Sequence, residues 1–347
     1  MKLQNHTISP NSPPFIIAEI SANHNQSLER ALKIVEAAAH AGAHAIKLQT
    51  YTPDTMTLDI NKGEFVITDE KSLWRGRSLY DLYKEAHTPW EWHKPIFERA
   101  RELNILAFST AFDKTSVDFL EKLKVPCYKI GSFENIDIPL IRKVASTGKP
   151  MIISTGMATI AELEETVKTA QENGCQEIVL LKCTSNYPAS PENTNLRTIP
   201  HMRDLFHCDI GLSDHTPGIG VAIASVGFGA TVIEKHFTLR RDDGGVDAPF
   251  SIEPEELKNL VAETERAWQA LGQIKYGPSL DEEKARLKRR SLYVAKDLKA
   301  GQILASSNLK SIRPGYGLAP RYYDMLIGKK INREVSKGTP ISWELFE

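Results

Sequence analysis

Cysteine is scarce in this sequence: the chain has 347 residues and only four cysteines. None of them lies in a C-x-x-C pair or in another metal-site spacing, which argues against a zinc site or a disulfide framework. We expect reduced thiols, three of them in or beside apolar strands, because proteins commonly bury cysteine as a small apolar side chain. They are Cys127, Cys175, Cys183 and Cys208.

An excess of charge and long apolar runs are also missing. The formal net charge is −1, so there is no basic field to attract nucleic acid or an anionic membrane. The chain has no apolar run of the roughly 18 residues that a membrane helix needs, and its opening MKLQNHTISPNSPP lacks the apolar core of a signal peptide. We therefore expect a cytoplasmic protein without nucleic-acid or membrane partners, in which local charge binds any anionic substrate.

Eight short apolar runs are present, separated by amphipathic segments. Most runs are continuous rather than alternating, which is typical of parallel strands covered on both faces. Eight strand-then-helix units predict an α/β fold, a (β/α)8 TIM barrel. A doubly wound open sheet is the alternative, but no dinucleotide-type glycine fingerprint follows the first run. The runs are 14–20, 45–50, 105–110, 127–132, 151–156, 177–183, 208–214 and 231–237.

Helical periodicity and end signals support this interpretation. Thr159 with Glu162 forms a capping-box pattern, and Gly42 and Gly174 stand where a helix C-terminal cap is expected. The predicted helices include 27–42, 90–103, 159–174, 217–229 and 254–271.

The sequence also predicts a division into domains. Residues 1–275 form the catalytic barrel, the polar and charged stretch 276–290 is a linker, and 291–347 form a small β-rich domain with frequent glycines and tight turns. A domain of about 60 residues is only marginally stable alone, so we expect the second domain to dock on another protein surface.

The segment 52–104 is longer than a simple crossover between two strands, and it contains three of the five tryptophans. Such insertions are often functional, and we expect this one to cross the mouth of the barrel.

Polar residues stand at the C-terminal ends of the predicted strands, where barrel enzymes carry their chemistry. A lone strand-end lysine usually extends to solvent, but polar ends on all eight strands predict an active site. These residues include Glu19, Lys47, Gln49, Thr110, Lys129, Ser132, Glu134, Ser154, Lys182, Ser185, Tyr187, Ser213, His215, Glu234, Lys235 and His236.

Two kinds of chemistry fit these residues. Lysines with hydroxyls suit a phosphate and a carboxylate. The histidines at the ends of strands 7 and 8, His215 and His236, suit a divalent metal with open coordination positions. Lysines near the ends of strands 2, 4, 6 and 8 resemble one basic layer. Alternation along strand 8 allows His236 or Lys235 to point inward, but not both. We expect His236 to point inward, with Glu234 on the same face, and Lys235 to point outward, away from the basic layer.

The same residues carry a family resemblance over about residues 14–345. The motifs IIAEISANHNQ, KLQTY, YKIGSFE, ISTGM, LLKCTSNYP, GLSDHT, EKHFT and DDGGVDAPFSIEP resemble the sialic acid synthase family in order. The tail KSIRPGYGL resembles the antifreeze-like (SAF) domain at the C-terminus of that family. Within the family, WRGRSLYDLYKEAHTPWEWH is similar to the branch that makes pseudaminic acid.

The resemblance implies a reaction and a metal. Phosphoenolpyruvate would condense with an open-chain amino sugar, 2,4-diacetamido-2,4,6-trideoxy-L-altrose in the pseudaminic branch, with release of phosphate by C–O cleavage. Synthesis of N-acetylneuraminate or legionaminate by the same mechanism is the alternative. A divalent metal is expected, Mn²⁺ first, although Mg²⁺ or Co²⁺ also suits two histidines and oxygen ligands.

The resemblance also implies a role for each site residue. His215 and His236 would hold the metal, with Glu19 near it. Glu134 or Glu19 would stabilise positive charge, and Tyr187 would line the pocket beside the reacting alkene. Ser185 stands where sialate synthases have an asparagine, and Ser21 and Gln26 stand where glycines are frequent, which predicts a stiffer first loop. The phosphate and carboxylate would meet Lys47, Thr110, Lys129, Ser132, Ser154 and Ser213, and the sugar would meet Gln49, Glu134 and Asp247.

Members of the family are dimers in which the antifreeze-like domain of one chain covers the barrel mouth of the other. This chain is therefore expected to form a domain-swapped homodimer, with Arg313 reaching an acetamido group of the substrate in the partner chain.

Two rival interpretations remain, one as a different enzyme and one as a binding protein. Lys182 on strand 6 stands where several barrel aldolases carry a Schiff-base lysine. The C-terminal domain could instead be an ice-binding module, but its charge is easier to explain as a docking or anion-binding surface. The charged residues concerned are Lys310, Arg313, Arg321, Lys329 and Lys330.

Overall fold

The computed structural model describes residues 1–70 and 72–346 of the chain. The chain divides into two compact units, Met1–Gly272 and Gln273–Glu347. Each unit has an apolar core of its own. The boundary between the units lies just before the predicted linker, 276–290. In the described part, no helix is long and apolar enough to cross a membrane.

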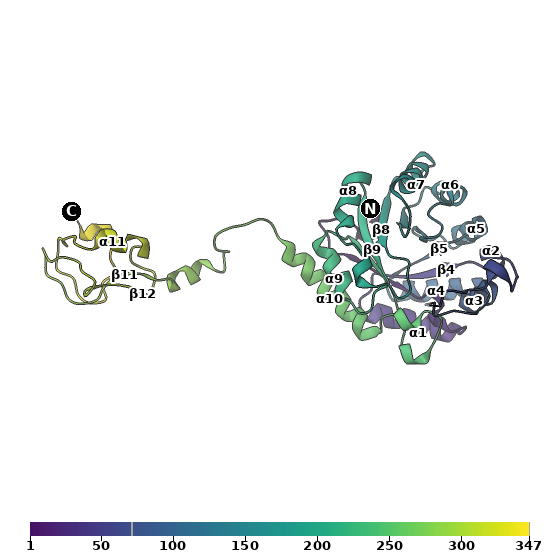
Figure 1. The fold of residues 1–347 in the computed structure, drawn as a ribbon, viewed down its shortest axis with the longest axis horizontal. Coiled ribbons are helices and arrows are strands. Elements are labelled where there is room, and N and C mark those ends of the chain that lie inside the picture. Colours follow the sequence, from purple (N-terminus) through teal and green to yellow (C-terminus); the bar gives the residue numbers. More distant parts are fainter. Residues whose placement is uncertain (71, 347) are drawn as a thin grey trace. The chain divides into compact units, whose positions relative to one another are not determined.

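Within the described residues of the first unit, eight parallel strands close into a barrel, which confirms the predicted TIM barrel (Figure 1). Each strand coincides with one predicted apolar run to within two residues at its ends. The strands follow chain order around the barrel, and β10 closes on β3. They are β3 (Phe15–Glu19), β4 (Ala45–Thr50), β5 (Leu106–Ala111), β6 (Tyr128–Ile130), β7 (Met151–Ser154), β8 (Ile178–Cys183), β9 (Asp209–Asp214) and β10 (Val232–His236).

The inside of the barrel is apolar at its lower end and polar at its upper end. Inward side chains of the lower layer, such as Ile17, Phe108, Leu181 and Val232, form one buried cluster. A short N-terminal hairpin of β1 (Lys2–Leu3) and β2 (His6–Thr7) lies against it and adds Leu3 to the cluster. The barrel is therefore filled below, as is usual for this fold, and its only polar layer lies at the C-terminal ends of the strands.

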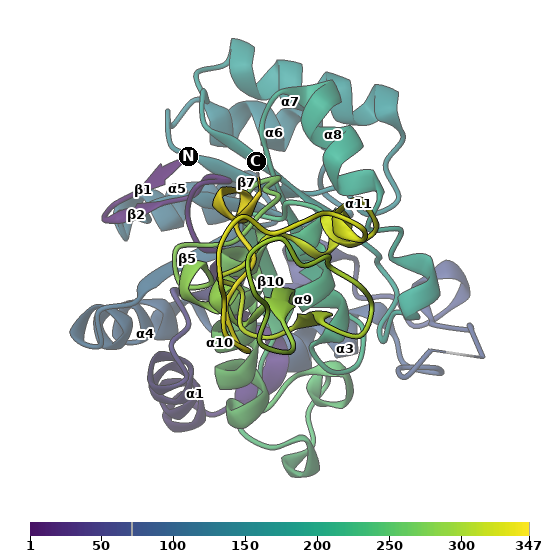
Figure 2. The same cartoon turned by 90° about the vertical axis from the view of Figure 1, so that its left-hand side faces the viewer.

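The helices pack outside the strands, with a second apolar cluster between them. Ser27 caps α1 through the amide of Arg30, and Thr159 forms the predicted capping box of α7. Figure 2 shows α1 beside α4 and α6 beside α7 around the barrel. These helices are α1 (Leu28–His40), α4 (Trp90–Glu102), α5 (Lys114–Lys122), α6 (Ile138–Ala145), α7 (Ile160–Glu172), α8 (Thr198–Phe206), α9 (Gly220–Gly227) and α10 (Pro254–Leu271).

The loops of the first unit contain further short helices. The long insertion after β4 holds α2 (Pro53–Met56), η2 (Gly63–Phe65) and α3 (Leu79–Ala86) ahead of α4. The indole Nε1 of Trp74 in this insertion donates to the carbonyl of Val246, 3.1 Å away, which ties the insertion to the loop after β10. The other short helices are η1 (Ser21–His24), η3 (Pro191–Asn193), η4 (Arg241–Asp243) and η5 (Ala248–Phe250).

Two predicted strand-end lysines point away from the barrel axis. Lys235 is fully buried on the outside of β10, where its Nζ lies 2.8 Å from Asp214 Oδ2 and 2.7 Å from the carbonyl of Thr216. The predicted outward direction of Lys235 is therefore right, and removing one partner of such a buried pair costs about 3–5 kcal/mol. Lys182 also faces outward, since its neighbour Cys183 faces inward, so the expectation that Lys182 belongs to the basic layer was wrong. Lys47 and Lys129 line the cavity as expected.

The second unit is small and rich in extended chain. An antiparallel hairpin of β11 (Ser291–Val294) and β12 (Leu309–Ile312) carries several side chains of its core, which also includes Leu304, Leu326 and Ile341. Short helices complete it: η6 (Glu283–Lys288), η7 (Pro320–Tyr322), α11 (Tyr323–Leu326) and η8 (Trp343–Leu345). Arg313 directly follows β12 and is exposed.

Candidate active site

A cavity of about 480 Å³ opens at the C-terminal ends of the strands. It brings together the predicted site residues of the barrel except Lys182, Lys235 and Glu19, the last of which is buried beside Lys47. Arg313 belongs to the second unit. The predicted residues that line the cavity are Lys47, Gln49, Thr110, Lys129, Ser132, Glu134, Ser154, Ser185, Tyr187, Ser213, His215, His236 and Asp247.

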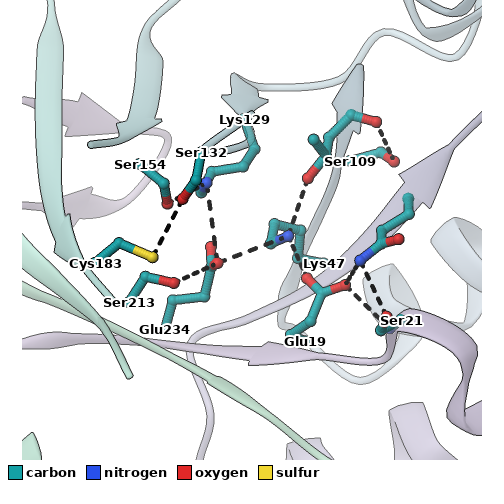
Figure 3. Close-up of polar contacts among 12 residues, drawn as sticks. Glu19, Ser21, Lys47, Ser109, Lys129, Ser132, Ser154, Cys183, Ser213 and Glu234 are labelled. Carbon is teal, nitrogen blue, oxygen red and sulfur yellow. Dashed lines mark hydrogen bonds and ion pairs between the residues drawn. The ribbon is translucent and has the colours of Figure 1, made fainter. Parts of the chain in front are cut away.

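The floor of the cavity is a cluster of two lysines and two glutamates (Figure 3). Lys47 forms an ion pair with Glu19 and lies 3.8 Å from Glu234 Oε1, and Lys129 lies 4.0 Å from the same oxygen. All four side chains are buried. Burying so many charges is tolerable only because opposite signs alternate. Within the part of the chain that the structure describes, Glu234 Oε2 is nevertheless buried without a hydrogen-bond partner.

The charged floor shifts the pKa of its members. Burial alone would raise the pKa of Glu234, but Lys129 and Lys47 outweigh it and hold the pKa below the usual value. Burial lowers the pKa of Lys129 in spite of Glu234. For Lys47 the lowering by burial is outweighed by Glu19 and Glu234, and its pKa is raised. Lys47 is therefore held firmly in its charged form.

Hydroxyl groups surround the two ammonium groups. Lys47 Nζ donates to Thr110 Oγ1 at 2.9 Å, and Lys129 Nζ donates to Ser154 Oγ at 2.7 Å. Ser213 Oγ donates to Glu234 Oε1 at 3.3 Å. Two cations with adjacent hydroxyls are a suitable receptor for a phosphate and a carboxylate, because charge-assisted hydrogen bonds to anions are among the strongest in proteins.

Next to this floor lie the two histidines of β9 and β10. Their ring centroids are 5.3 Å apart, and Tyr187 packs against His215 with a centroid distance of 4.4 Å. His215 Nδ1 lies 3.0 Å from the carbonyl of Thr184, so Nδ1 carries a proton that it donates to this oxygen. In the neutral ring, the lone pair is then on Nε2. Burial lowers the pKa of His236 well below its usual value.

These imidazoles fit a metal with few protein ligands. Among the described residues, no group of three or more His, Cys, Asp or Glu side chains could hold an ion. In the same residues, His236 Nδ1 is buried without a hydrogen-bond partner, a costly arrangement that metal coordination would relieve. Metal ligation requires neutral imidazole, which the lowered pKa of His236 provides.

Further from the floor, both polar and apolar groups line the cavity. Gln49, Asp247 and Glu134 are among the polar ones. The insertion after β4 and the loops after β5 and β6 supply apolar groups: Met56, Ile67, Trp74, Leu79, Leu82, Tyr83, Phe112 and Phe133. The predicted position of the insertion at the barrel mouth is therefore confirmed.

Some cavity residues escaped prediction. Cys183 was expected to be an ordinary buried thiol, but it lines the cavity, where its Sγ accepts from Ser132 Oγ at 3.2 Å. Alternation from Ser185 would have found it. Glu234 was recognised only as an inward residue, and Ser21 only as a residue of the first loop. Lys182 lies outside the cavity, beside Glu192 and Arg197, which removes the geometric basis for a Schiff-base role.

Glu134 yields a prediction about stability and pH. Burial raises its pKa to about 7, so the folded protein binds a proton more tightly than the unfolded chain. Stability from this group is present at low pH and is lost as pH rises from about 4.5 to 7. Urea unfolding of the wild type and Glu134→Gln at pH 5 and pH 8 should show the wild type losing about 2–3 kcal/mol more than the variant. An equal change in both proteins would contradict this assignment.

Comparison with known proteins agrees with the site. Residues 34–276 match the NeuB family, and residues 289–347 match the SAF domain. The chain is 45% identical to the pseudaminic acid synthase of Campylobacter jejuni serotype O:2 over 96% of both chains, and 40% identical to that of Helicobacter pylori over 96% of this chain and 98% of the relative. A crystal structure of N-acetylneuraminic acid synthetase from Leptospira borgpetersenii superposes with a TM-score of 0.73 at 34% identity, covering 82% of this chain and 94% of the other. The chain belongs to the NeuB family, the sialic acid synthases, and carries their C-terminal SAF domain.

Proposed function

We propose that the chain is a transferase that condenses phosphoenolpyruvate with a diacetamido-trideoxy hexose to give pseudaminic acid and phosphate. One observation supports it most: two buried lysines with adjacent hydroxyls lie beside a histidine pair in one cavity. The names of the C. jejuni and H. pylori relatives support the choice of sugar. A Schiff-base aldolase is disfavoured, because Lys182 lies outside the cavity.

Phosphoenolpyruvate would lie on the floor of the cavity. Lys47 and Lys129 offset the charge of its phosphate and carboxylate. Hydroxyl groups on neighbouring strands complete the anion site, namely Thr110, Ser132, Ser154 and Ser213. Holding both substrates in one orientation is worth roughly 7 kcal/mol or more of the barrier.

His215 and His236 would hold a divalent metal at the edge of this floor. Bound there, the metal would supply Lewis-acid polarisation of the aldehyde oxygen. Mn²⁺ is the expected ion, and Mg²⁺ and Co²⁺ suit the same donors. Glu19 lies level with His236 on the neighbouring strand, so it is placed to orient a water near the metal.

The chemistry needs a base and a carboxylate near the reacting carbons. Carbon 3 of phosphoenolpyruvate bonds to the aldehyde carbon, whose oxygen takes a proton, and positive charge develops at carbon 2. Glu134 or Glu19 stabilises that charge as a carboxylate. Water adds to carbon 2, and the carbon–oxygen bond between carbon 2 and phosphate breaks. Of the two protons of water, one replaces the proton taken by the aldehyde oxygen and the other leaves with phosphate. Tyr187 packs beside His215 and covers this region.

The sugar would occupy the outer part of the cavity. Gln49, Glu134, Asp247 and Ser185 would contact its hydroxyl and amide groups. The apolar groups supplied by the insertion would receive methyl groups of the acetamido substituents and of the deoxygenated end.

Free thiols at all four cysteines support a cytoplasmic location, where phosphoenolpyruvate is made.

The choice of sugar is tested by phosphate release with three substrates in parallel. These are the open-chain precursors of pseudaminic, legionaminic and neuraminic acids. We expect kcat/KM to be highest with the pseudaminic precursor by at least about a hundred-fold, because mismatched polar groups in a buried site are strongly rejected. A preference for either other precursor would move the assignment to that synthase. No release with any of them would rule out the reaction.

The metal site is tested by His215→Ala and His236→Ala. Each variant should lose Mn²⁺ binding, measured by electron paramagnetic resonance, and at least about a hundred-fold in kcat. His201→Ala is the control, because His201 is exposed on α8, outside this cavity. Near-normal turnover by either site variant without added metal would refute the proposed ligands.

We also infer a homodimer in which the second unit of one chain covers the cavity of the other. Large apolar side chains are exposed at the mouth of the barrel, including Phe133 and Met157, each 60% exposed. The second unit exposes Tyr316 and Trp343. Such exposed apolar groups are typical of surfaces that meet another protein. In this arrangement Arg313 would reach an acetamido group of the sugar in the partner chain.

The role of Arg313 is tested by Arg313→Ala, with Lys310→Ala in the preceding strand, β12, as the control. We expect the sugar KM to rise about ten-fold in the first variant only, with the KM for phosphoenolpyruvate unchanged. When the Arg313→Ala and His236→Ala proteins are mixed, part of the activity should have a wild-type sugar KM. Each mixed dimer contains one intact site, in which a barrel that keeps His236 is covered by a second unit that keeps Arg313. No change of KM in Arg313→Ala would exclude the contact.

A further inference from the structure

Ser21, directly after β3 and Ile20, has an unusual backbone conformation at the edge of the cavity. Its φ is 47°, in the left-handed region that favours glycine, and its side chain is buried and lines the cavity. Asn25 and Gln26 in the same loop also have positive φ, 47° and 54°. Strained residues of this kind persist where the surroundings over-determine them, and they gather at functional sites.

The hydroxyl of Ser21 joins two polar side chains of the cavity. It donates to Asp247 Oδ2, and it accepts from Gln49 Nε2 at 3.0 Å. Gln49 Nε2 also donates to Glu19 Oε1 at 3.2 Å, and the amide of Ser21 donates to the same oxygen at 3.0 Å. One oxygen atom thus connects side chains of the second barrel strand and of the loop after the last one.

This connection leaves one oxygen free on each of the two side chains. Among the described residues, neither Gln49 Oε1 nor Asp247 Oδ1 takes part in a hydrogen bond within the protein. Both residues line the cavity, so these oxygens are acceptors available to N–H or O–H groups of a ligand. A glycine at position 21 would suit the backbone better but would leave Gln49 and Asp247 unconnected.

We propose that Ser21 is a positioning residue for the amino sugar: its hydroxyl holds Gln49 and Asp247 so that their free oxygens accept hydrogen bonds from amide and hydroxyl groups of the substrate. This inference rests on the proposed function. It adds a specificity determinant at a position whose φ of 47° would suit glycine better.

A purely structural role makes a different prediction. The loop holding Ser21 is also tied to the loop after β10 by Asn25, whose Nδ2 donates to the carbonyl of Gly244 at 3.0 Å. Asn25 has the same φ as Ser21 but does not line the cavity. If Ser21 only fastened the two loops together, Asn25→Gly would weaken sugar binding as much as Ser21→Gly does.

The test compares Ser21→Gly, Ser21→Ala and Asn25→Gly by steady-state kinetics and thermal unfolding. We expect both Ser21 variants to raise the sugar KM about ten-fold, the size expected for a lost charge-assisted hydrogen bond, with the KM for phosphoenolpyruvate unchanged. Ser21→Gly should melt no lower than the wild type, because glycine tolerates this φ. Asn25→Gly should keep the wild-type sugar KM. In an Asp247→Asn background, Ser21→Gly should raise the sugar KM by less than about two-fold, because the partner of its hydroxyl has already been changed.

A wild-type sugar KM in Ser21→Gly, or an equal rise in Asn25→Gly, would overturn the proposal. A double-mutant cycle of Ser21→Ala, Asp247→Asn and the double variant, measured as free energies of unfolding, checks the hydrogen bond without any substrate. Additive changes in the free energy of unfolding would overturn the proposal as well. Failure of the wild type to use any of the three sugars would instead overturn the proposed function, while the unfolding cycle would still decide the hydrogen bond.

Discussion

The alternation of charge on the cavity floor is the constraint on which the rest of the site depends. Four ionised side chains are removed from water at the top of an otherwise apolar barrel, and only their arrangement makes this affordable. Glu234 lies between Lys47 and Lys129, and Glu19 holds Lys47 from the other side. Each member comes from a different strand, so the cluster exists only when the barrel has closed with β10 beside β3. Fold and chemistry therefore share one requirement.

The strands and the direction of their side chains could be predicted because both follow from local pattern. Continuous apolar runs marked every strand, and alternation separated His236 from Lys235 correctly. The partner of Lys235 could not be predicted in the same way, because Asp214 reaches it only through the pairing of β9 with β10. Lys182 was misjudged for a simpler reason: proximity to a strand end was used without the alternation that Ser185 already fixed.

Other parts of the site depend on contacts that no local pattern contains. Ser21 and Asp247 are 226 positions apart and meet because the first and last strands are neighbours. Cys183 was judged by its residue type, and cysteines are usually buried for packing alone. The insertion after β4 was recognised from its length, whereas the fact that Trp74 fixes it to Val246 needed the structure. Local chemistry thus predicted most of the residues that line the cavity, and tertiary pairing decided what each one touches.

The apolar cluster below the floor has a consequence for how molecules enter and leave the cavity. Ile17, Phe108, Leu181 and Val232 fill the lower barrel, and the N-terminal hairpin adds Leu3 to the same cluster. The cavity is thus a blind-ended well, with its charged groups at the bottom and the insertion at its rim. In such a well, a molecule can reach the two lysines only from the end that the insertion lines, and it has to leave by the same end.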